Sequence, residues 1–339
     1  MVEGWLKRGR AALAIAAFLA LITVIANLSR MPYVLFPELG ALGWVICSNP
    51  RHPWARSPAL LLLTPFLAAV QGLWITRHLA YGLPAVLLDV GLTLLVIAAL
   101  RSPIVPALSA GLLPLALEIR TWAYPFSILI GIGALALFLV LRRHWSREPA
   151  PSLPAAETAA TPPRSALPPL RAWALPFGGF LVGALLLVEW IGSPLVLFPP
   201  LLVIAFEMIV HRQQCPWRGR YGGVLVATNG AALVGLALVK TLGVVPAAAF
   251  LAVLATLALL RLLRLPFPPA LGLALLPFVI PQPPLTYPLF TLVGSLWLLL
   301  VVALQEALAG GGGGSAGSGG EAAAPSVGAT GAGGAIGTA

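Results

Sequence analysis

The chain contains an internal repeat in which proline-containing landmarks return at a constant spacing. Tyr124-Pro125, for example, recurs as Tyr287-Pro288 (287 − 124 = 163). Further pairs at this spacing are Pro53-Trp54 with Pro216-Trp217, Pro103 with Pro266, Pro106 with Pro269, and Leu112-Leu113-Pro114 with Leu275-Leu276-Pro277. Leu35-Phe36-Pro37 matches Leu197-Phe198-Pro199 at a spacing shorter by one (197 − 35 = 162), so one single-residue gap aligns the halves. Chance does not keep several prolines in register, and duplicated halves in a hydrophobic chain are a common architecture of transporters.

Composition places the chain in a lipid bilayer. Hydrophobic residues make up 59% and charged residues 9% of it, whereas a soluble domain is about half apolar and a quarter charged. The net charge of +10 comes from basic residues at the ends of apolar runs, which is typical of membrane orientation, so no nucleic-acid partner is expected. Cys47 and Cys215 occupy non-equivalent places in the repeat and lie outside any CxxC, which favours buried apolar roles.

Apolar segments divide the chain into two membrane halves. The first half has segments near 11–29, 33–48, 58–76, 83–100, 103–118 and 122–141, and the second near 173–191, 195–211, 221–240, 244–260, 266–281 and 285–305. The first run is long enough to span and lacks a clear A-x-A cleavage site, so we interpret it as a retained helix. The expected division is a first repeat at 1–146, a cytoplasmic Pro/Ala-rich linker at 147–170, a second repeat at 171–309 and a disordered Gly/Ala/Ser tail at 310–339.

The basic residues predict the orientation. If the N-terminus is cytoplasmic and all twelve segments cross, sixteen of the 20 Lys and Arg residues lie inside and four outside. Six crossings per half give both halves the same orientation. The sequence therefore predicts an all-α, multi-pass protein of the cell inner (plasma) membrane, with two parallel six-segment repeats and both termini cytoplasmic.

Two segments in each half are too short for an ordinary spanning helix. Segment 33–48 gives about 24 Å of helix at 1.5 Å per residue, against roughly 30 Å of hydrocarbon. Segments 103–118, 195–211 and 266–281 behave likewise and are expected to be broken or re-entrant. The spacing of Pro37 and Pro106 (106 − 37 = 69) equals that of Pro199 and Pro268 (268 − 199 = 69). This agreement favours nested three-plus-three inverted repeats, although prolines are frequent in membrane helices anyway.

The prolines of these short segments predict helix N-termini, because a first-turn proline loses no hydrogen bond. Inside the membrane such N-termini would present free N–H groups and a positive dipole end to a small anion; at the surface they would be ordinary helix starts.

Carboxylates in or near apolar segments are the other candidates, since a charge at depth is costly and usually functional. They are Glu38, Asp89, Glu118, Glu189 and Glu207. Glu207 and Asp89 are the ones we expect to be buried, Glu38 is a candidate for proton coupling, and all fit equally with snorkelling at an interface. Thr228-Asn229 either forms hydrogen bonds across helices or binds ligand. The predicted substrate-binding residues are Pro37, Glu38, Pro106, Ser109, Pro199, Pro200, Glu207, Thr228, Asn229, Pro268 and Pro269.

Outside the Gly/Ala/Ser tail, enzyme signatures do not occur: residues 1–309 contain no HExxH, GxSxG, paired-aspartate DxxD, Gly-rich phosphate loop or histidine cluster. We therefore predict no catalytic residue, no metal site and no cofactor.

The stretch from Phe267-Pro268-Pro269 to Leu276 resembles the HPP family of bacterial, cyanobacterial and plastid membrane proteins, which is named for a His-Pro-Pro before a small-residue helix. Arg218 followed by Gly222-Gly223 resembles the family's Arg-x-x-x-Gly-Gly-His stretch, and the run 35–41 resembles its short-segment start. Each half would be one HPP-like unit. Phe267 and Val224 stand where the family has histidine, and the first half has Ile104-Val105-Pro106.

The resemblance implies a permease for a small anion such as nitrite, with the short helices at 36–39, 105–108, 198–201 and 267–270 lining its site. Rocking of one helix group against another would then give alternating access. The scarcity of polar groups supports the alternative, a non-transporting membrane scaffold or partner subunit. Homo-oligomerisation is left open.

Overall fold

The computed structural model describes residues 2–49, 52–146 and 168–311, and over these ranges it contains helices and no strand. The first half contains α1 (Val2–Ser29), η1 (Pro32–Val34), α2 (Glu38–Ser48), α3 (Pro53–Arg56), α4 (Pro58–His78), α5 (Leu83–Ala99), α6 (Ala107–Ala116) and α7 (Ala123–Ser146). The second contains η2 (Leu170–Ala172), α8 (Ala174–Ile191), η3 (Pro194–Leu197), α9 (Pro199–Ala205), η4 (Phe206–Val210), α10 (Tyr221–Leu242), α11 (Pro246–Leu262), α12 (Pro269–Leu275), η5 (Leu276–Phe278) and α13 (Tyr287–Gly311). The expected linker and tail lie almost entirely outside the described residues.

Proline and glycine set several helix boundaries. Pro58 is the first residue of α4 and Pro246 that of α11, positions where the missing N–H costs no intrahelical bond. Gly192 follows α8 with φ +73°, a left-handed conformation that ends the helix and that glycine adopts without strain.

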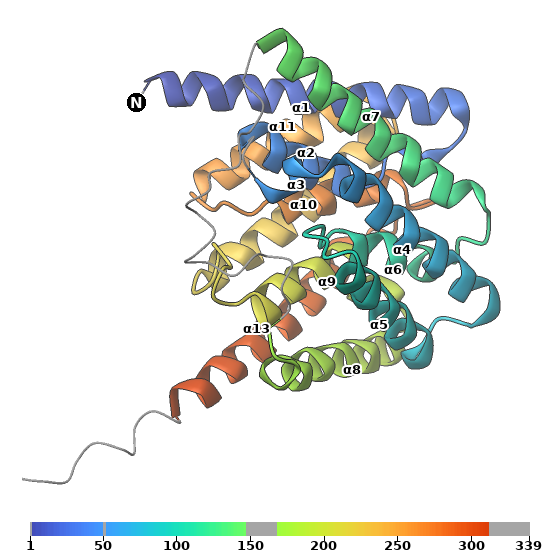
Figure 1. The fold of residues 1–339 in the computed structure, drawn as a ribbon, viewed down its shortest axis with the longest axis vertical. Coiled ribbons are helices and arrows are strands. Elements are labelled where there is room, and N and C mark those ends of the chain that lie inside the picture. The colour runs from blue at the N-terminus through green and yellow to red at the C-terminus, as the bar shows by residue number, and fades with distance from the viewer. Residues whose placement is uncertain (1, 50–51, 147–167, 312–339) are drawn as a thin grey trace, which may run out of the picture.

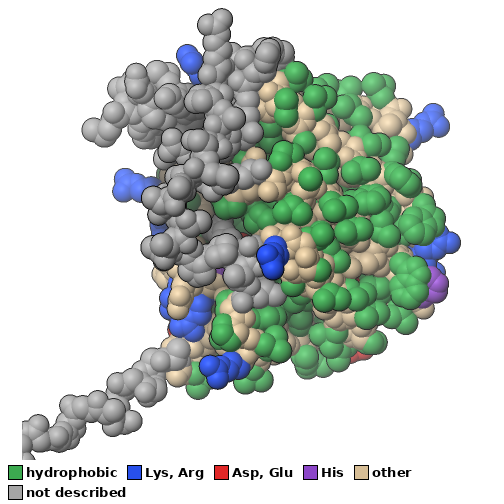
Figure 2. Space-filling model, viewed as in Figure 1, with side chains coloured by type: hydrophobic (Ala, Val, Ile, Leu, Met, Phe, Trp, Pro, Cys, Tyr) green, Lys and Arg blue, Asp and Glu red, His purple; other side chains and the backbone are tan. Residues whose placement is uncertain are grey.

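Among the described residues, six helices are long and apolar enough to cross a membrane: α1, α4, α7, α8, α10 and α13. Apolar side chains predominate on the described part of the face seen in Figure 2, where the few Lys and Arg side chains lie mostly toward the margins. Among the large apolar side chains, Leu175 and Trp190 are 85% and 84% exposed. A bilayer accounts for such a surface, which would be unfavourable in water. The chain therefore has the build of a multi-pass membrane protein.

The four segments expected to be short contain short helices. α2 and α6 have 11 and 10 residues, and α9 and α12 have 7 each. The wider π-helical turn η4 continues α9, and the tighter 3-10 turn η5 continues α12. An 11-residue helix is about 16 Å long, roughly half the hydrocarbon thickness.

Equivalent contacts recur in the two halves at the repeat spacing. The Tyr124 hydroxyl donates to the Ala110 carbonyl at 2.6 Å, and the Tyr287 hydroxyl donates to the Leu273 carbonyl at 3.0 Å (273 − 110 = 163). Each bond ties the start of a long helix to the short helix before it, so both halves hold their short helix in the same way.

The short helices of the two halves pack against each other across the centre of the molecule, an arrangement that we call the exchange of short helices. α2 packs against α12 of the second half, and α9 packs against α6 of the first. The fit is close, because a Cβ at Gly40 would lie 2.9 Å from Leu275 Cδ1 and 3.0 Å from Leu271 Cβ. Figure 1 shows α1 and α8 at opposite ends of the molecule, with short helices between them. The centre is therefore built from both halves.

The outer contacts of the halves differ. α1 packs along α11, and Asn27 Nδ2 donates to the Val244 carbonyl at 2.9 Å. The corresponding pair, α8 and α5, is separated at one end by an apolar groove of about 480 Å³ lined by residues 79–84 and 182–189. Glu189 and Tyr81 occupy the positions equivalent to Asn27 (189 − 27 = 162) and Val244 (244 − 81 = 163). A carboxylate cannot donate to a carbonyl as Asn27 does, and the Tyr81 hydroxyl has no hydrogen-bond partner in the part of the chain that is described.

Candidate functional site

A buried carboxyl lies where the exchanged short helices meet. Glu38 is the first residue of α2, follows Pro37 directly, and is 1% exposed. Ser109, the third residue of α6, donates its hydroxyl to Glu38 Oε1 at 2.6 Å. Two predicted site residues, 71 positions apart, are therefore in contact.

The second carboxyl oxygen of Glu38 faces the other half. A Cβ at Gly272, the fourth residue of α12, would lie 3.1 Å from Oε2. Gly272 is the repeat equivalent of Ser109 (272 − 109 = 163), so the carboxyl lies between equivalent positions of the two halves. Oε2 has no hydrogen-bond partner among the described residues, and no cation there pairs with Glu38.

The Pro-containing segments begin helices, as predicted. Pro37 precedes α2, Pro106 precedes α6, Pro199 and Pro200 open α9, and Pro268 and Pro269 stand at the start of α12; Pro268 is half-buried and the others are buried.

Several backbone N–H groups at these starts already have acceptors. Leu39 donates to the Phe36 carbonyl and Leu201 to the Phe198 carbonyl, both at 2.9 Å. Leu108 donates to Val105 and Leu271 to Pro268, both at 3.0 Å. Tight i→i−3 turns thus satisfy these four donors in the first turn of each helix, which is the arrangement of an ordinary helix start, one of the two expectations for these segments.

Glu207 lies in a separate cluster. It is 5% exposed on the π-helical turn η4, and its Oε2 is 3.5 Å from Nδ1 of His211, which is also 5% exposed. This distance is within ion-pair range, but the two atoms do not form a hydrogen bond. π-helical turns are frequent at functional sites, and the burial of Glu207 confirms the prediction from sequence.

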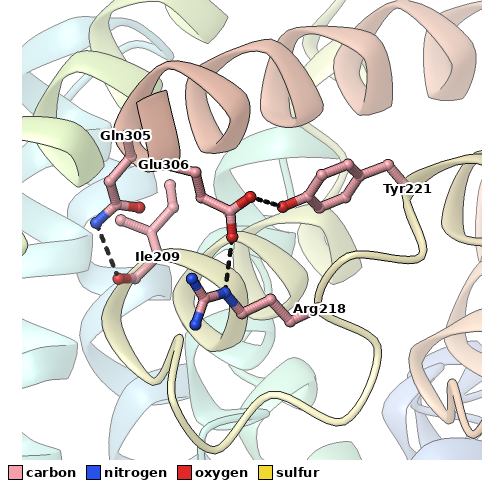
Figure 3. A network of polar contacts seen from close by, with 5 residues as sticks. All are labelled: Ile209, Arg218, Tyr221, Gln305 and Glu306. Carbon is pink, nitrogen blue, oxygen red and sulfur yellow. Dashed lines mark hydrogen bonds and ion pairs between the residues drawn. The ribbon is translucent and has the colours of Figure 1, made fainter. Parts of the chain in front are cut away.

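A polar network beside η4 joins α10 and α13 (Figure 3). Arg218 Nε donates to Glu306 Oε1 at 2.7 Å, and the Tyr221 hydroxyl donates to Oε2 of the same carboxylate. Gln305 Nε2 approaches the Ile209 carbonyl of η4 at 3.5 Å. The hydrogen bond to Glu306 raises the pKa of the Arg218 guanidinium, which stays charged. These groups are partly exposed, so the network orients helix ends and contributes little stability.

Thr228 and Asn229 connect α10 to α13. Ser295 Oγ donates to Thr228 Oγ1 at 3.3 Å, and Thr291 Oγ1 lies 3.4 Å from Asn229 Oδ1. This is the cross-helix arrangement that was one of the two expectations for the pair.

The remaining acidic candidates divide by exposure. Glu118 and Glu189 are exposed, as expected for interface positions, whereas Asp89 is fully buried on α5, as predicted. In the described ranges, no three His, Cys, Asp or Glu side chains lie together in a way that would hold a metal ion. A scan against models of known protein families finds no match, and comparisons with the curated proteins and with the solved structures find no match either.

The sequence did not single out Gly272 or Gly111, although both face buried carboxyls. The repeat carried a signal for them. In the repeat alignment Gly272 corresponds to Ser109, and Gly111 corresponds to Ala274. A glycine in one half at the position of a larger residue in the other indicates that a neighbouring side chain needs the space there.

Proposed function

We propose that the protein is a membrane permease for a small anion, nitrite among the candidates, with its site at Glu38 and Ser109. The observation that carries the proposal is the Glu38 carboxyl, buried between the halves with one oxygen unpartnered. This position holds an acidic group with no paired cation among the described residues. It lies at the first turn of α6, where the helix dipole favours negative charge.

The shape of the carboxyl defines a substrate class. A carboxylate places two oxygens on one central atom, and formate and nitrite have the same bent geometry. We infer that such an anion takes the place of the Glu38 side chain, accepts the hydrogen bond of Ser109, and lies in the space that Gly272 leaves open. Larger tetrahedral anions would collide with the packed helices around it.

The unequal outer contacts support a transport cycle. One outer pair, α1 with α11, is closed, and the equivalent pair, α8 with α5, is parted by the groove. We propose that the two pairs alternate between these states, so that the central site opens to one side and then to the other. In this proposal twelve segments cross or enter the inner membrane and form two parallel repeats. Each repeat contains a nested pair of inverted three-segment units, and both termini are cytoplasmic.

Replacement of the missing side chain by an added anion tests the site. Glu38→Ala should lower stability by roughly 1–3 kcal/mol, because the buried Ser109 hydroxyl loses its acceptor. Formate or nitrite should then raise the unfolding temperature of this variant in detergent, because the anion fills the vacated position. Sulfate should not. The matched control is Glu207→Ala, which removes a buried carboxyl from the separate cluster and should not respond to either anion.

Proteoliposomes test the activity. The wild-type protein should move nitrite or formate in a panel that also contains nitrate. An absence of flux for every anion, together with no rescue of Glu38→Ala, would contradict the proposal.

The alternative function is a non-transporting scaffold or partner subunit. The close packing of α2 on α12 and the satisfied N–H groups at the helix starts favour it. A scaffold predicts no flux and a Glu38→Ala variant that anions do not stabilise. Membership of the HPP family is likewise a proposal, based on the motifs around Phe267 and Gly222-Gly223.

A further inference from the structure

A second buried carboxyl lies against α6, close to the Glu38 contact. Asp89 on α5 is 0% exposed, and neither of its oxygens has a hydrogen-bond partner in the described part of the chain. A Cβ at Gly111 would lie 2.7 and 2.9 Å from the two Asp89 oxygens and 2.9 Å from Thr93 Oγ1. Three oxygens therefore lie close to the backbone of α6 at Gly111. A side chain at position 111 would collide with them.

Gln71 on α4 limits what this cluster can bind. Its amide nitrogen donates to the Asp89 backbone carbonyl at 3.1 Å and also to Thr93 Oγ1. Because a carbonyl only accepts, the amide presents its N–H side, not its oxygen, to the cluster. Alkali and alkaline-earth cations require a shell of oxygens, so a donor in this position disfavours them. A proton needs only one carboxyl oxygen.

No positive charge on a described residue pairs with Asp89. The other titratable or charged side chains on the described elements packed against α5 are Arg77 and His78 at the end of α4 and Glu189 on α8, and none of them pairs with it. Tyr124 on α7 directs its hydroxyl to the Ala110 carbonyl. An ionised carboxylate without a partner is costly in an apolar interior, whereas a carboxylic acid is tolerated there.

The second half shows the same site without the carboxyl. The repeat equivalents of Asp89 and Gly111 are Ala252 and Ala274 (252 − 89 = 163 and 274 − 111 = 163). The backbone geometry is alike, because a Cβ at Gly72 would overlap the carbonyl of residue 111 and one at Gly235 would overlap that of residue 274. The aspartate–glycine pair and the alanine–alanine pair are thus two solutions for one packing position.

We propose that Asp89, cradled by Gly111 and Thr93, binds and releases the proton that crosses the membrane with the anion. The inference rests on the proposed function and adds its coupling ion. The carboxylate takes up a proton from one side and releases the same proton to the other, so one anion and one proton cross as a neutral pair. α6 links the two steps, because Ser109 contacts the anion position and Gly111 contacts Asp89.

The chain supplies its own test variant. Asp89→Ala combined with Gly111→Ala reproduces the alanine pair of the second half and should therefore fold. In proteoliposomes with an inward gradient of one pH unit, the wild type should accumulate the anion about tenfold, the limit for one proton per anion. The double variant should lose this accumulation and keep anion-for-anion exchange, which moves no net proton. Accumulation that persists in the double variant, or that follows a sodium gradient, overturns the proposal.

Infrared spectroscopy measures the protonation state of the Asp89 carboxyl independently of any transport assay. The wild-type minus double-variant difference spectrum at neutral pH should contain the carbonyl band of a protonated carboxylic acid. A difference spectrum with only carboxylate bands overturns the assignment. If the acid band is present but neither protein moves an anion, the proposed function fails while the proton site at Asp89 stands.

Discussion

At the scale of single residues, two tyrosines at equivalent positions of the repeat form the same kind of hydrogen bond. Tyr124 and Tyr287 are both 0% exposed, and each bonds a carbonyl of the adjoining short helix. A short helix surrounded by apolar side chains has few polar contacts to fix its depth, so one hydroxyl can orient it. Tyr81 provides a contrast, because its hydroxyl is buried but has no partner in the described structure.

Tyr124→Phe and Tyr287→Phe should each lower the free energy of unfolding by roughly 0.5–2 kcal/mol, because each leaves a buried carbonyl without its donor. The two losses should be similar, since the contacts are equivalent. Tyr81→Phe is the matched control and should be neutral or slightly stabilising. Thermal unfolding in detergent measures all three, and a Tyr81→Phe loss as large as the others would refute the explanation.

At the scale of helices, glycine faces let the short helices approach the long ones. Gly72 on α4 meets the backbone of α6, and Gly235 on α10 meets that of α12, both without room for a Cβ. Gly91 on α5 and Gly222 on α10 have nothing within 4 Å of such an atom. The two kinds of glycine cannot be told apart by residue type, but the contacts separate them.

Gly72→Ala and Gly235→Ala should therefore each cost roughly 1–3 kcal/mol, because the paired helices have to move apart. Gly91→Ala and Gly222→Ala should be neutral or stabilising by up to about 1 kcal/mol, the usual gain from alanine in a helix. Denaturation in mixed micelles provides the comparison, and equal losses at all four positions would show that the helix contacts are not the cause.

The limits of sequence-based prediction lie at this same scale. Local rules predicted the helix starts at Pro37, Pro106 and Pro199, and the cost of charge predicted the burial of Asp89. The contact of Glu38 with Ser109 was not predicted, because it depends on how two helices pack across the chain. The sequence also left open whether the N–H groups at the starts are free, and the structure pairs those of Leu39 and Leu201 with carbonyls three residues earlier.

At the scale of the whole molecule, the exchange of short helices makes the halves interdependent. α2 needs α12 and α9 needs α6, although each half carries a complete set of long helices. Each sequence repeat is therefore not a domain that is stable on its own.

Expression of residues 1–146 alone should give protein that aggregates on extraction, because the buried face of α2 lacks its cover. Co-expression with residues 168–339 should restore a monodisperse complex, which size-exclusion chromatography and co-purification through a tag on one half will detect. A monodisperse, stable first half would contradict the dependence inferred from the exchange.

The packing of α2 against α12 also has a consequence for biosynthesis, because α12 is made long after α2. The last residue of α2 is Ser48 and the first of α12 is Pro269, so most of the chain lies between them (269 − 48 = 221). At typical ribosomal speeds, roughly 10–45 s pass between the synthesis of the two. Ser109 is made early in that interval and can contact Glu38, but the side of Glu38 that faces Gly272 lacks its permanent neighbour until α12 is made. The last short helix to leave the ribosome therefore completes the environment of one of the first residues to enter the membrane.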